Sequence, residues 1–272
     1  MIPTPIALTI AGSDSGSGAG VQADLRTFTA LGVYAATAIT AVTSQNTVEV
    51  VDVFPLPAEV VAAQIAAVRA DFYVAAIKTG MLATAKICEA VVTSLRKGPA
   101  ALVVSDPVLS ASVGASFGNE ALIAAMRTRL LPEVDCLTPN LGEAALLLGR
   151  PIARTEDEMA AQARALLDLG AKAVLIKGGH LQGDEAVDWL VWRDGRRRYA
   201  APKMNTSNLH GTGCTLASAV VAGLVKGLAL PDAVMTAKEF TLGAIRRAVG
   251  GQLGSGSGPL LQFSIADELR PR

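Results

Sequence analysis

The stretch IALTIAG, residues 6–12, together with GAGVQADLRTFTALG, residues 18–32, decides the fold of this chain. The first part is a short apolar run that ends in glycine, which is typical of a buried strand. The second part repeats its apolar residues at the spacing of one helix face and stops at Gly32. The two parts predict a strand that leads through a glycine-rich turn into a helix.

The same alternation of strand and helix patterns continues to the end of the chain. Apolar runs predict further strands at 34–42, 48–54, 73–80, 101–108, 134–140 and 171–179, and two strands around an Asp194-Gly195 turn in 185–202. Helical spacing predicts helices at 57–71, 84–97, 118–132, 155–170, 212–227 and 231–249, the fourth opening with a capping box of Thr155 and Glu158. Such an alternation predicts an α/β fold with a mostly parallel sheet that helices cover on both faces, here as a single domain, 1–272.

Composition excludes several classes of function. The chain has 272 residues, of which 51% are apolar and 18% charged, and its 24 basic and 24 acidic residues give a net charge of 0. This balance does not favour binding to nucleic acid or to an anionic membrane. No Lys or Arg precedes Arg26, so the charged start of a signal peptide is missing, and the longest apolar run, 214–225, is too short to span a bilayer. We therefore expect a cytoplasmic protein.

Three cysteines, Cys88, Cys136 and Cys214, stand far apart in the sequence. An odd number at wide spacing, without an export signal, does not predict a disulfide framework. With His180 and His210 as the only histidines and no C-x-x-C pattern, a structural zinc site lacks ligands.

The segment after the first strand, GSDSGSGAGVQAD, contains glycines at the spacing G-x-G-x-x-A, through Gly18, Gly20 and Ala23. A dinucleotide-binding fold would need an acidic residue at the end of the second strand, and none precedes Glu49. A glycine-rich loop that closes over another ligand is the better interpretation. Asp24 could reach that ligand, or could serve only as a first-turn acid that the helix dipole stabilises.

Polar residues follow the predicted strands, and ligands of parallel sheets bind beyond these ends. Gln45 could pair with a heteroaromatic amine next to a ring nitrogen, or be an ordinary polar loop residue. Acidic Asp106 and Glu143, with Asn140, suit Mg²⁺ and phosphate. Lys177 with two following glycines suits a phosphate group.

Cys214 stands in HGTGCTLASA, residues 210–219, where a helix begins after two glycines. The free N–H groups and the dipole of a helix start favour an anion, such as a phosphoryl group in transfer. The same field is expected to lower the pKa of the Cys214 thiol, which could then take a proton from an attacking hydroxyl. The alternative is a small buried helix residue, as Cys88 and Cys136 are expected to be.

Several motifs together resemble the hydroxymethylpyrimidine/phosphomethylpyrimidine kinases of thiamine synthesis, which belong to the ribokinase-like superfamily. The motifs, in chain order, are ALTIAGSDSGSGAGVQADLRTF (7–28), TAVTSQNT (40–47), IKTGML (77–82), DPV (106–108), TPNLGEA (138–144), IKGGH (176–180) and HGTGCTLASA (210–219). The resemblance covers essentially the whole chain. It implies a three-layer α/β/α domain that uses ATP to phosphorylate 4-amino-5-hydroxymethyl-2-methylpyrimidine and then its monophosphate.

The resemblance also implies roles for single residues. Cys214 would be the catalytic base, in the place that an aspartate holds in many ribokinase relatives, and Gly211, Thr212 and Gly213 would form the anion hole. Asp24 and Gln45 would hold the pyrimidine in a pocket lined by Gly12, Met81 and Val108. Asp106 and Glu143 would order Mg²⁺. The ATP molecule would contact Asn140, Lys177, Gly179, Thr212 and Lys238.

The chain departs from the family pattern at two places. Gly142 replaces the proline of the usual NLPEA, and the late loop reads GSGPLLQ, 256–262, without the family's two histidines. In the family this loop borders the nucleotide region.

The amides of the loop 16–20 are the expected contact for the phosphate of a monophosphate acceptor.

Two alternatives remain open at this point. One is a pyridoxal kinase, because close relatives phosphorylate B6 vitamers on a similar frame, and the other is a non-catalytic pyrimidine-binding protein. We expect a small-molecule substrate, no nucleic-acid or membrane partner, and a homodimer.

Overall fold

In the computed structural model the described residues are 6–109 and 117–263. Their strands form one nine-stranded sheet in the order β3-β2-β1-β4-β5-β6-β7-β8-β9. The neighbours from β2 to β7 in this order run parallel, whereas β3, β8 and β9 pair in antiparallel fashion at the two ends. The strands are β1 (Ile6–Asp14), β2 (Tyr34–Gln45), β3 (Val50–Pro55), β4 (Val74–Thr79), β5 (Leu102–Ser105), β6 (Cys136–Leu137), β7 (Ala173–Gly178), β8 (Glu185–Trp192) and β9 (Gly195–Pro202).

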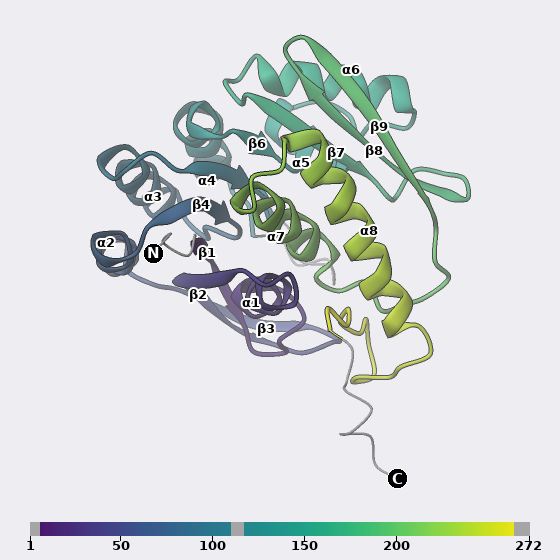
Figure 1. Cartoon of the computed structure of the whole chain (residues 1–272), viewed down its shortest axis with the longest axis horizontal. Coiled ribbons are helices and arrows are strands. Elements are labelled where there is room, and N and C mark those ends of the chain that lie inside the picture. The colour runs from purple at the N-terminus through teal and green to yellow at the C-terminus, as the bar shows by residue number, and fades with distance from the viewer. Residues whose placement is uncertain (1–5, 110–116, 264–272) are drawn as a thin grey trace.

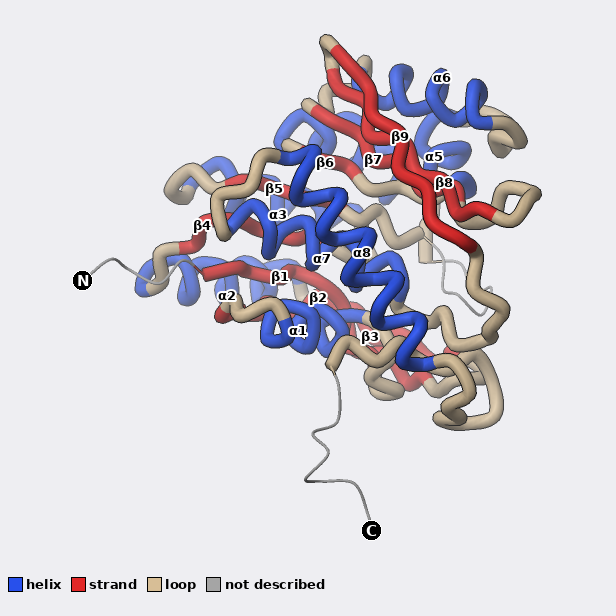
Figure 2. The backbone as a smooth tube through the Cα atoms, turned by 45° about the vertical axis from the view of Figure 1, so that its right-hand side comes forward, coloured by secondary structure: helices blue, strands red, loops and turns tan. Residues whose placement is uncertain are grey.

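Helices cover both faces of the sheet, which gives the expected three layers (Figure 1, Figure 2). Helices α1, α7 and α8 pack on one face, and α2 to α6 on the other. Within the described residues the α-helices are α1 (Gly20–Ala30), α2 (Ala58–Asp71), α3 (Ala85–Lys97), α4 (Glu120–Ala125), α5 (Leu141–Leu148), α6 (Glu156–Leu167), α7 (Thr212–Val225) and α8 (Leu230–Ala248). The predicted α/β/α class with a mostly parallel central sheet is confirmed.

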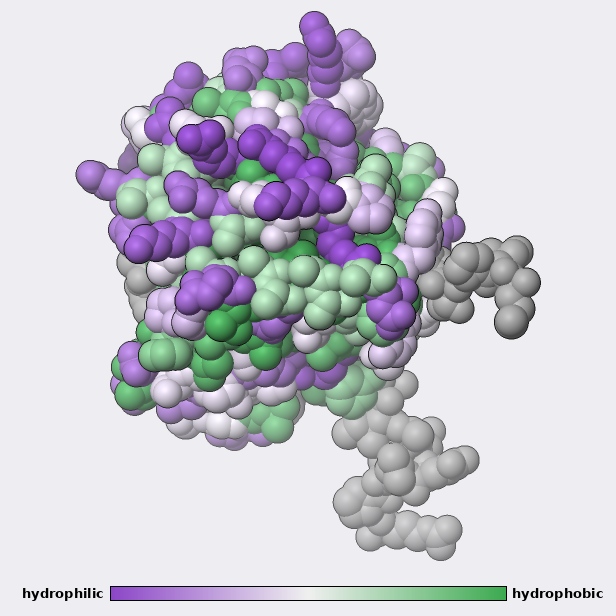
Figure 3. Space-filling model, turned by 90° about the vertical axis from the view of Figure 1, so that its left-hand side faces the viewer, coloured by the Kyte–Doolittle hydropathy of each residue, from purple (hydrophilic) through white to green (hydrophobic). Residues whose placement is uncertain are grey.

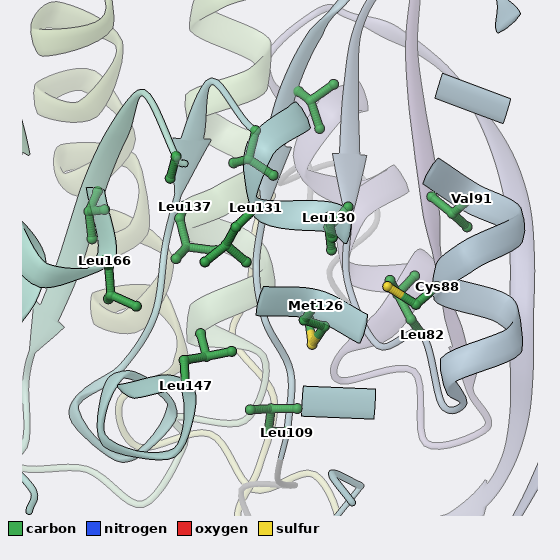
Figure 4. Close-up of a cluster of buried hydrophobic side chains, with 14 of the residues drawn as sticks. Leu82, Cys88, Val91, Leu109, Met126, Leu130, Leu131, Leu137, Leu147 and Leu166 are labelled. Carbon is green, nitrogen blue, oxygen red and sulfur yellow. The ribbon is translucent and has the colours of Figure 1, made fainter. Parts of the chain in front are cut away.

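Each face of the sheet has its own hydrophobic cluster. Successive side chains of a strand point to opposite faces, so Leu8 and Ile10 of β1 join one cluster and Ala7 joins the other. Figure 4 shows the larger cluster, in which leucines from several helices and loops surround Met126. Cys88 belongs to this cluster and Cys136 to the second. Burial raises the pKa of both thiols to about 12, so both remain protonated and inert at neutral pH.

The helix predicted over 118–132 is broken into three pieces. Helix α4 ends at Ala125, a π-helical turn follows over Met126–Leu130, and a 3₁₀ turn closes the segment over Leu131–Glu133. The reason lies in Pro132, which has no N–H to donate to the helix ladder. The changed winding allows Met126, Leu130 and Leu131 to be buried together in the core.

The strand predicted over 134–140 is wrong in length, since only Cys136 and Leu137 pair as β6. The chain turns directly into helix α5, which the sequence reasoning did not predict. The signal was present, because Asn140 and Glu143 form a full capping box and Gly149, with φ of 63°, ends the helix.

The capping box predicted at the start of α6 is half formed. The Thr155 side chain accepts from the Glu158 amide at 3.2 Å, but the Glu158 carboxylate accepts from the Arg154 amide at 2.6 Å. The carboxylate therefore caps the residue before the expected one.

In residues 6–109 and 117–263 no helix combines the length and the apolarity needed to cross a bilayer. Hydrophilic and apolar side chains are interspersed on the side of the molecule shown in Figure 3.

Candidate functional site

A cavity of about 1180 Å³ opens at the carboxyl ends of the parallel strands and reaches the start of α7. It gathers all of the predicted site residues except Asp24. Those residues are Gly12, Gln45, Met81, Asp106, Val108, Asn140, Glu143, Lys177, Gly179, Gly211, Thr212, Gly213, Cys214 and Lys238.

Two glycines shape the start of α7. Gly211, the residue before the helix, has φ of +85°, and a side chain there would also collide with the carbonyl oxygen of Gly18. A Cβ on Gly213 would lie only 3.1 Å from Lys177 Nζ and 3.3 Å from Asp106 Oδ2. The glycines thus let the helix start approach the β1–α1 loop on one side and the Lys177–Asp106 pair on the other. This arrangement leaves N–H groups of the helix start beside a cation, which suits an anion.

Lys177 and Asp106 form an ion pair at 2.7 Å between Nζ and Oδ1. The same Asp106 oxygen accepts a hydrogen bond from Thr138 Oγ1 at 3.1 Å. Burial lowers the pKa of Lys177, but the carboxylates of Asp106 and Glu143 raise it more, so it lies above its usual value. Lys177 is therefore a fixed positive charge at the centre of the cavity.

Glu143 is buried, and it both caps α5 and lines the cavity. Its Oε2 accepts from the Asn140 amide at 2.7 Å, while Asn140 Oδ1 accepts from the Glu143 amide at 2.9 Å. Burial, together with the Asp106 carboxylate, raises the pKa of Glu143 to about 7, although the Lys177 ammonium and the Asn140 amide lower it. The capping box thus fixes the position of Glu143, and the raised pKa leaves its carboxyl group only partly ionised at neutral pH.

The donor set fits a magnesium ion that phosphate oxygens hold in part. Asp106 and Glu143 both line the cavity, and the Asp106 carboxylate disfavours the charged form of Glu143, a repulsion that a divalent cation would relieve. Mg²⁺ usually takes one or two carboxylates together with substrate phosphates and water. No group of three His, Cys, Asp or Glu side chains suited to a metal occurs in the described part of the chain, so these carboxylates would not form a full cage.

Cys214 lies at the third position of α7 and lines the cavity, with 8% of its surface exposed. The expected lowering of its pKa is wrong. Burial raises the pKa of the thiol to about 11, although the Lys78 ammonium and the Gly20 amide lower it. Desolvation of the thiolate outweighs the favourable field, so the thiol is protonated at neutral pH before substrates bind.

Asp24 does not reach the cavity, because the structure places it beneath the floor. It is fully buried, and its carboxylate binds Thr9 Oγ1 at 2.6 Å, Lys78 Nζ at 3.0 Å and Ser218 Oγ at 2.7 Å. Both oxygens thus have protein partners, which does not support a direct contact with the pyrimidine. Lys78, which the sequence reasoning did not single out, lines the cavity instead.

Gln45 lies in a polar network at the other end of the cavity. Its Nε2 is 3.3 Å from His210 Nε2, which in turn is 2.9 Å from Asp14 Oδ2. Burial raises the pKa of Asp14, but the hydrogen bonds from His210, Ala19 and Gly16 lower it more. His210 and Asp14 were missed as single residues, although both stand inside the motifs that carry the resemblance.

Asp14 also bears on the expected contact between the amides of residues 16–20 and an acceptor phosphate. The amides of Gly16 and Ala19 each donate to the Asp14 carboxylate at 2.8 Å. These two donors are occupied, so an acceptor phosphate cannot use them unless the loop rearranges. A side chain on Gly18 would collide with the His210 ring, which shows how closely the loop packs on the segment before α7.

The remaining pocket residues divide between two ends. Near Gln45, Gly12 lies against Met81, since a Cβ on Gly12 would come within 2.5 Å of Met81 Cε. At the far end, Lys238 of α8 binds Asp188 Oδ2 at 2.6 Å and the Ala186 carbonyl at 2.9 Å. Its charge is thus already compensated within the protein.

The two departures from the family pattern have different consequences. Gly142 is the second residue of α5, a first-turn position where a proline lacks no intrahelical hydrogen bond, so the exchange leaves Asn140 and Glu143 in place. The late loop contacts the Gln45 side of the site. Ser257 N donates to the Thr47 carbonyl at 2.9 Å, and His210 N donates to the Gly258 carbonyl at 3.1 Å.

Comparison with known proteins agrees with this geometry. The family model described as phosphomethylpyrimidine kinase matches residues 14–261. A hydroxymethylpyrimidine/phosphomethylpyrimidine kinase of Rhizobium meliloti is 49% identical over 96% of this chain and 97% of its own.

Solved structures give the same fold. An ADP complex of Bacillus subtilis pyridoxal kinase is 36% identical with a TM-score of 0.87, covering 95% of this chain and 97% of its own. A phosphomethylpyrimidine kinase of Clostridium difficile is 37% identical with a TM-score of 0.79, covering 89% and 99%. The resemblance seen in the motifs is confirmed, and the chain belongs to the phosphomethylpyrimidine kinase family.

Proposed function

We propose that this protein transfers the γ-phosphoryl group of ATP to the hydroxymethyl group of 4-amino-5-hydroxymethyl-2-methylpyrimidine. It then phosphorylates the monophosphate to the diphosphate, as a step of thiamine biosynthesis. The observation that carries the proposal is the placement of Cys214 and the start of α7 beside the Lys177–Asp106 pair, in one cavity with Gln45. Relatives named hydroxymethylpyrimidine/phosphomethylpyrimidine kinase match nearly the whole chain and support the proposed substrates.

The residues divide the work as the chemistry requires. Phosphoryl transfer depends mainly on positioning and on stabilising charge, and a fixed cation next to helix N–H groups supplies the second. Lys177 and the amides of residues 211–213 would hold the transferring group, with Asn140, Gly179, Thr212 and Lys238 as the proposed contacts to the rest of the nucleotide. Mg²⁺, when bound at Asp106 and Glu143, would neutralise phosphate charge.

Gln45 is the proposed contact to the pyrimidine, within a pocket formed by Gly12, Met81 and Val108. The His210–Asp14 pair lies next to its amide. Cys214 would accept the proton of the attacking hydroxyl. The thiolate form of Cys214 is the base, and a loose transition state needs the hydroxyl proton to leave only late in the transfer.

One experiment tests the assignment of Cys214. A positioned base contributes about 10²–10⁴-fold in rate. The variant Cys214→Ala should lose kcat on that scale for the pyrimidine while its KM stays within about threefold, because binding does not need the proton transfer. A variant with near-wild-type kcat would show that the thiol is only a packing residue.

A second candidate activity is the phosphorylation of pyridoxal, which the higher TM-score to a pyridoxal kinase favours. A coupled assay of ADP release with the pyrimidine, its monophosphate and pyridoxal separates the two. The proposal expects the highest kcat/KM with the two pyrimidines.

The homodimer and the cytoplasmic location stay predictions. The exposed apolar side chains of Val42, Val51 and Phe54 at the β2–β3 end of the sheet support the homodimer.

A further inference from the structure

Lys78 and Asp24 form an ion pair that has no contact with solvent. The distance between Lys78 Nζ and Asp24 Oδ2 is 3.0 Å, and both side chains are 0% exposed. Asp24 Oδ2 also accepts from Thr9 Oγ1 at 2.6 Å, and its Oδ1 accepts from Ser218 Oγ at 2.7 Å. The carboxylate is thus held by three donors from β1, β4 and α7.

A contribution to the stability of the fold does not by itself explain such a pair. A buried ion pair often contributes less than well-packed apolar residues of the same volume, because both charges lose their hydration. Removing one partner, however, leaves a costly uncompensated charge. A cation that is built in at this cost, and that lines the cavity of a kinase, is a candidate for a role in the reaction.

The position of the cluster connects it to Cys214. Ser218 lies four residues after Cys214 on α7, so both side chains lie on one face of the helix, one turn apart. Ser218 holds Asp24, and Asp24 holds Lys78. Lys78 and Cys214 are both among the residues that border the cavity, with the Lys78 ammonium enclosed beneath its wall.

We propose that Lys78 is a positioning residue that acts through Cys214, by holding negative charge on the Cys214 sulfur. Asp24, which Ser218 also holds, keeps the ammonium in place. In the transfer step the thiolate accepts the proton as the O–H bond of the acceptor breaks and its oxygen bonds to phosphorus, while ADP leaves with the electron pair of the broken P–O bond. The inference rests on the proposed function in so far as Cys214 is the base of that reaction.

The charges around the sulfur agree with this role. The carboxylates of Asp24 and Asp106 raise the pKa of the Cys214 thiol, the Lys78 ammonium and the Gly20 amide lower it, and Cys214 in turn raises the pKa of Lys177. After burial, which raises the pKa of the thiol, Lys78 is the largest influence and lowers it. The ammonium itself stays charged, because Asp24, Cys214 and Asp106 raise the pKa of Lys78 more than burial lowers it.

The test measures the thiolate directly and needs no turnover. The full-length protein is treated with iodoacetamide from neutral pH to about pH 10, and modification of the Cys214 peptide is followed by mass spectrometry. In Lys78→Met the rate at a fixed pH should fall about tenfold or more, which corresponds to a rise of at least one unit in the pKa of the thiol. The kcat of this variant should fall as well, while KM for the pyrimidine changes little.

Two further variants keep the result interpretable. Lys78→Met leaves Asp24 unpaired, so Lys78→Met/Asp24→Asn removes both charges and preserves the fold if the single variant does not fold. It should also slow alkylation, by a smaller factor, because Asp24 opposes Lys78 at the sulfur. Thr9→Val removes one hydrogen bond to Asp24 but keeps both charges, and should alkylate within about twofold of the wild type.

An unchanged pH dependence of Cys214 alkylation in a folded variant that lacks the Lys78 ammonium would overturn the inference. So would an equal slowing in Thr9→Val, since that would indicate a packing effect. Failure of the proposed function would look different, because the pyrimidine would then not be phosphorylated by the wild type while the alkylation rates still differed.

Discussion

At the scale of the residue, the sulfur of Cys214 gives the site its expected dependence on pH. Burial raises the pKa of this thiol to about 11, so the thiolate fraction in the free protein is small at neutral pH and grows with pH. Because kcat/KM reports the ionisation of the free enzyme, it should rise by up to about tenfold per pH unit above neutrality, as far as the fold allows.

The variant Cys214→Asp checks this origin of the slope. A carboxylate is ionised at neutral pH even when its pKa is raised by a few units, so its kcat/KM should be nearly flat from about pH 7 to 9. Steady-state kinetics in a constant-ionic-strength buffer series measures both profiles. Equal slopes in the two proteins would assign the pH dependence to another group.

Gln45 carries the second prediction at this scale. Its amide is half-buried in the proposed pyrimidine pocket, 3.3 Å from His210 Nε2, so Gln45→Leu leaves the polar edge of the pyrimidine unpaired. The expected loss is about 1–3 kcal/mol of binding, which is about 5- to 150-fold in Kd. Isothermal titration with the aminopyrimidine and with pyridoxal is the measurement, and equal losses for both ligands would rule out a ring-specific contact.

At the scale of the element, α7 depends on the glycine that precedes it. Gly211 and Gly227 flank the helix with nearly the same φ, +85° and +84°. A side chain on Gly211 collides with the Gly18 carbonyl, whereas one on Gly227 meets nothing within 4 Å. The two positions therefore separate backbone strain from displacement of the glycine-rich loop.

Both Gly211→Ala and Gly227→Ala should lose about 1–2 kcal/mol of unfolding free energy, because alanine disfavours a positive φ. Only Gly211→Ala should also lose kcat, by about tenfold or more, since the helix start must shift away from the loop that contacts Cys214. Urea unfolding and kinetics on the same preparations test this. A similar kcat loss in Gly227→Ala would attribute the effect to α7 as a whole.

The sequence predicted long periodic elements well and short ones poorly. Helices α7 and α8 were placed within two residues of their observed ends, because buried apolar faces and glycines mark them clearly. Helix α5 was not predicted because it has only eight residues and follows a two-residue strand after the short connection 138–140. Its capping residues were identified, but for their possible ligands rather than for the helix.

At the scale of the whole molecule, the parallel topology made the site predictable. Residues more than 200 positions apart in the sequence, such as Gly12 and Cys214, line one cavity because strand ends meet at one edge of the sheet. The topology could not predict which side chains border the cavity and which lie beneath it. Asp24 points beneath the cavity and Lys78 lines its floor, and this difference depends on helix rotation and on hydrogen bonds that only the packed structure defines.

The cavity also bears on whether a single site performs both phosphorylations. The first product is an anion, and the amides of Gly16 and Ala19, which could receive its phosphate, are bound to Asp14. The second step thus requires the loop to rearrange, and we expect it to be slower than the first, with free monophosphate present before diphosphate. Chromatography of a time course with ATP, Mg²⁺ and the pyrimidine measures the order in which the products appear.

The same time course decides between one site and two when it is repeated with Cys214→Ala. If one thiol serves both acceptors, each step started from its own substrate should lose a similar factor, within about tenfold of the other, on the scale of a positioned base. A variant that lost only the first step would require a second acceptor site away from α7. Wild-type protein that accumulated monophosphate and never formed diphosphate would instead be a single-step kinase, because the Asp14-bound loop would then not open for an anionic acceptor.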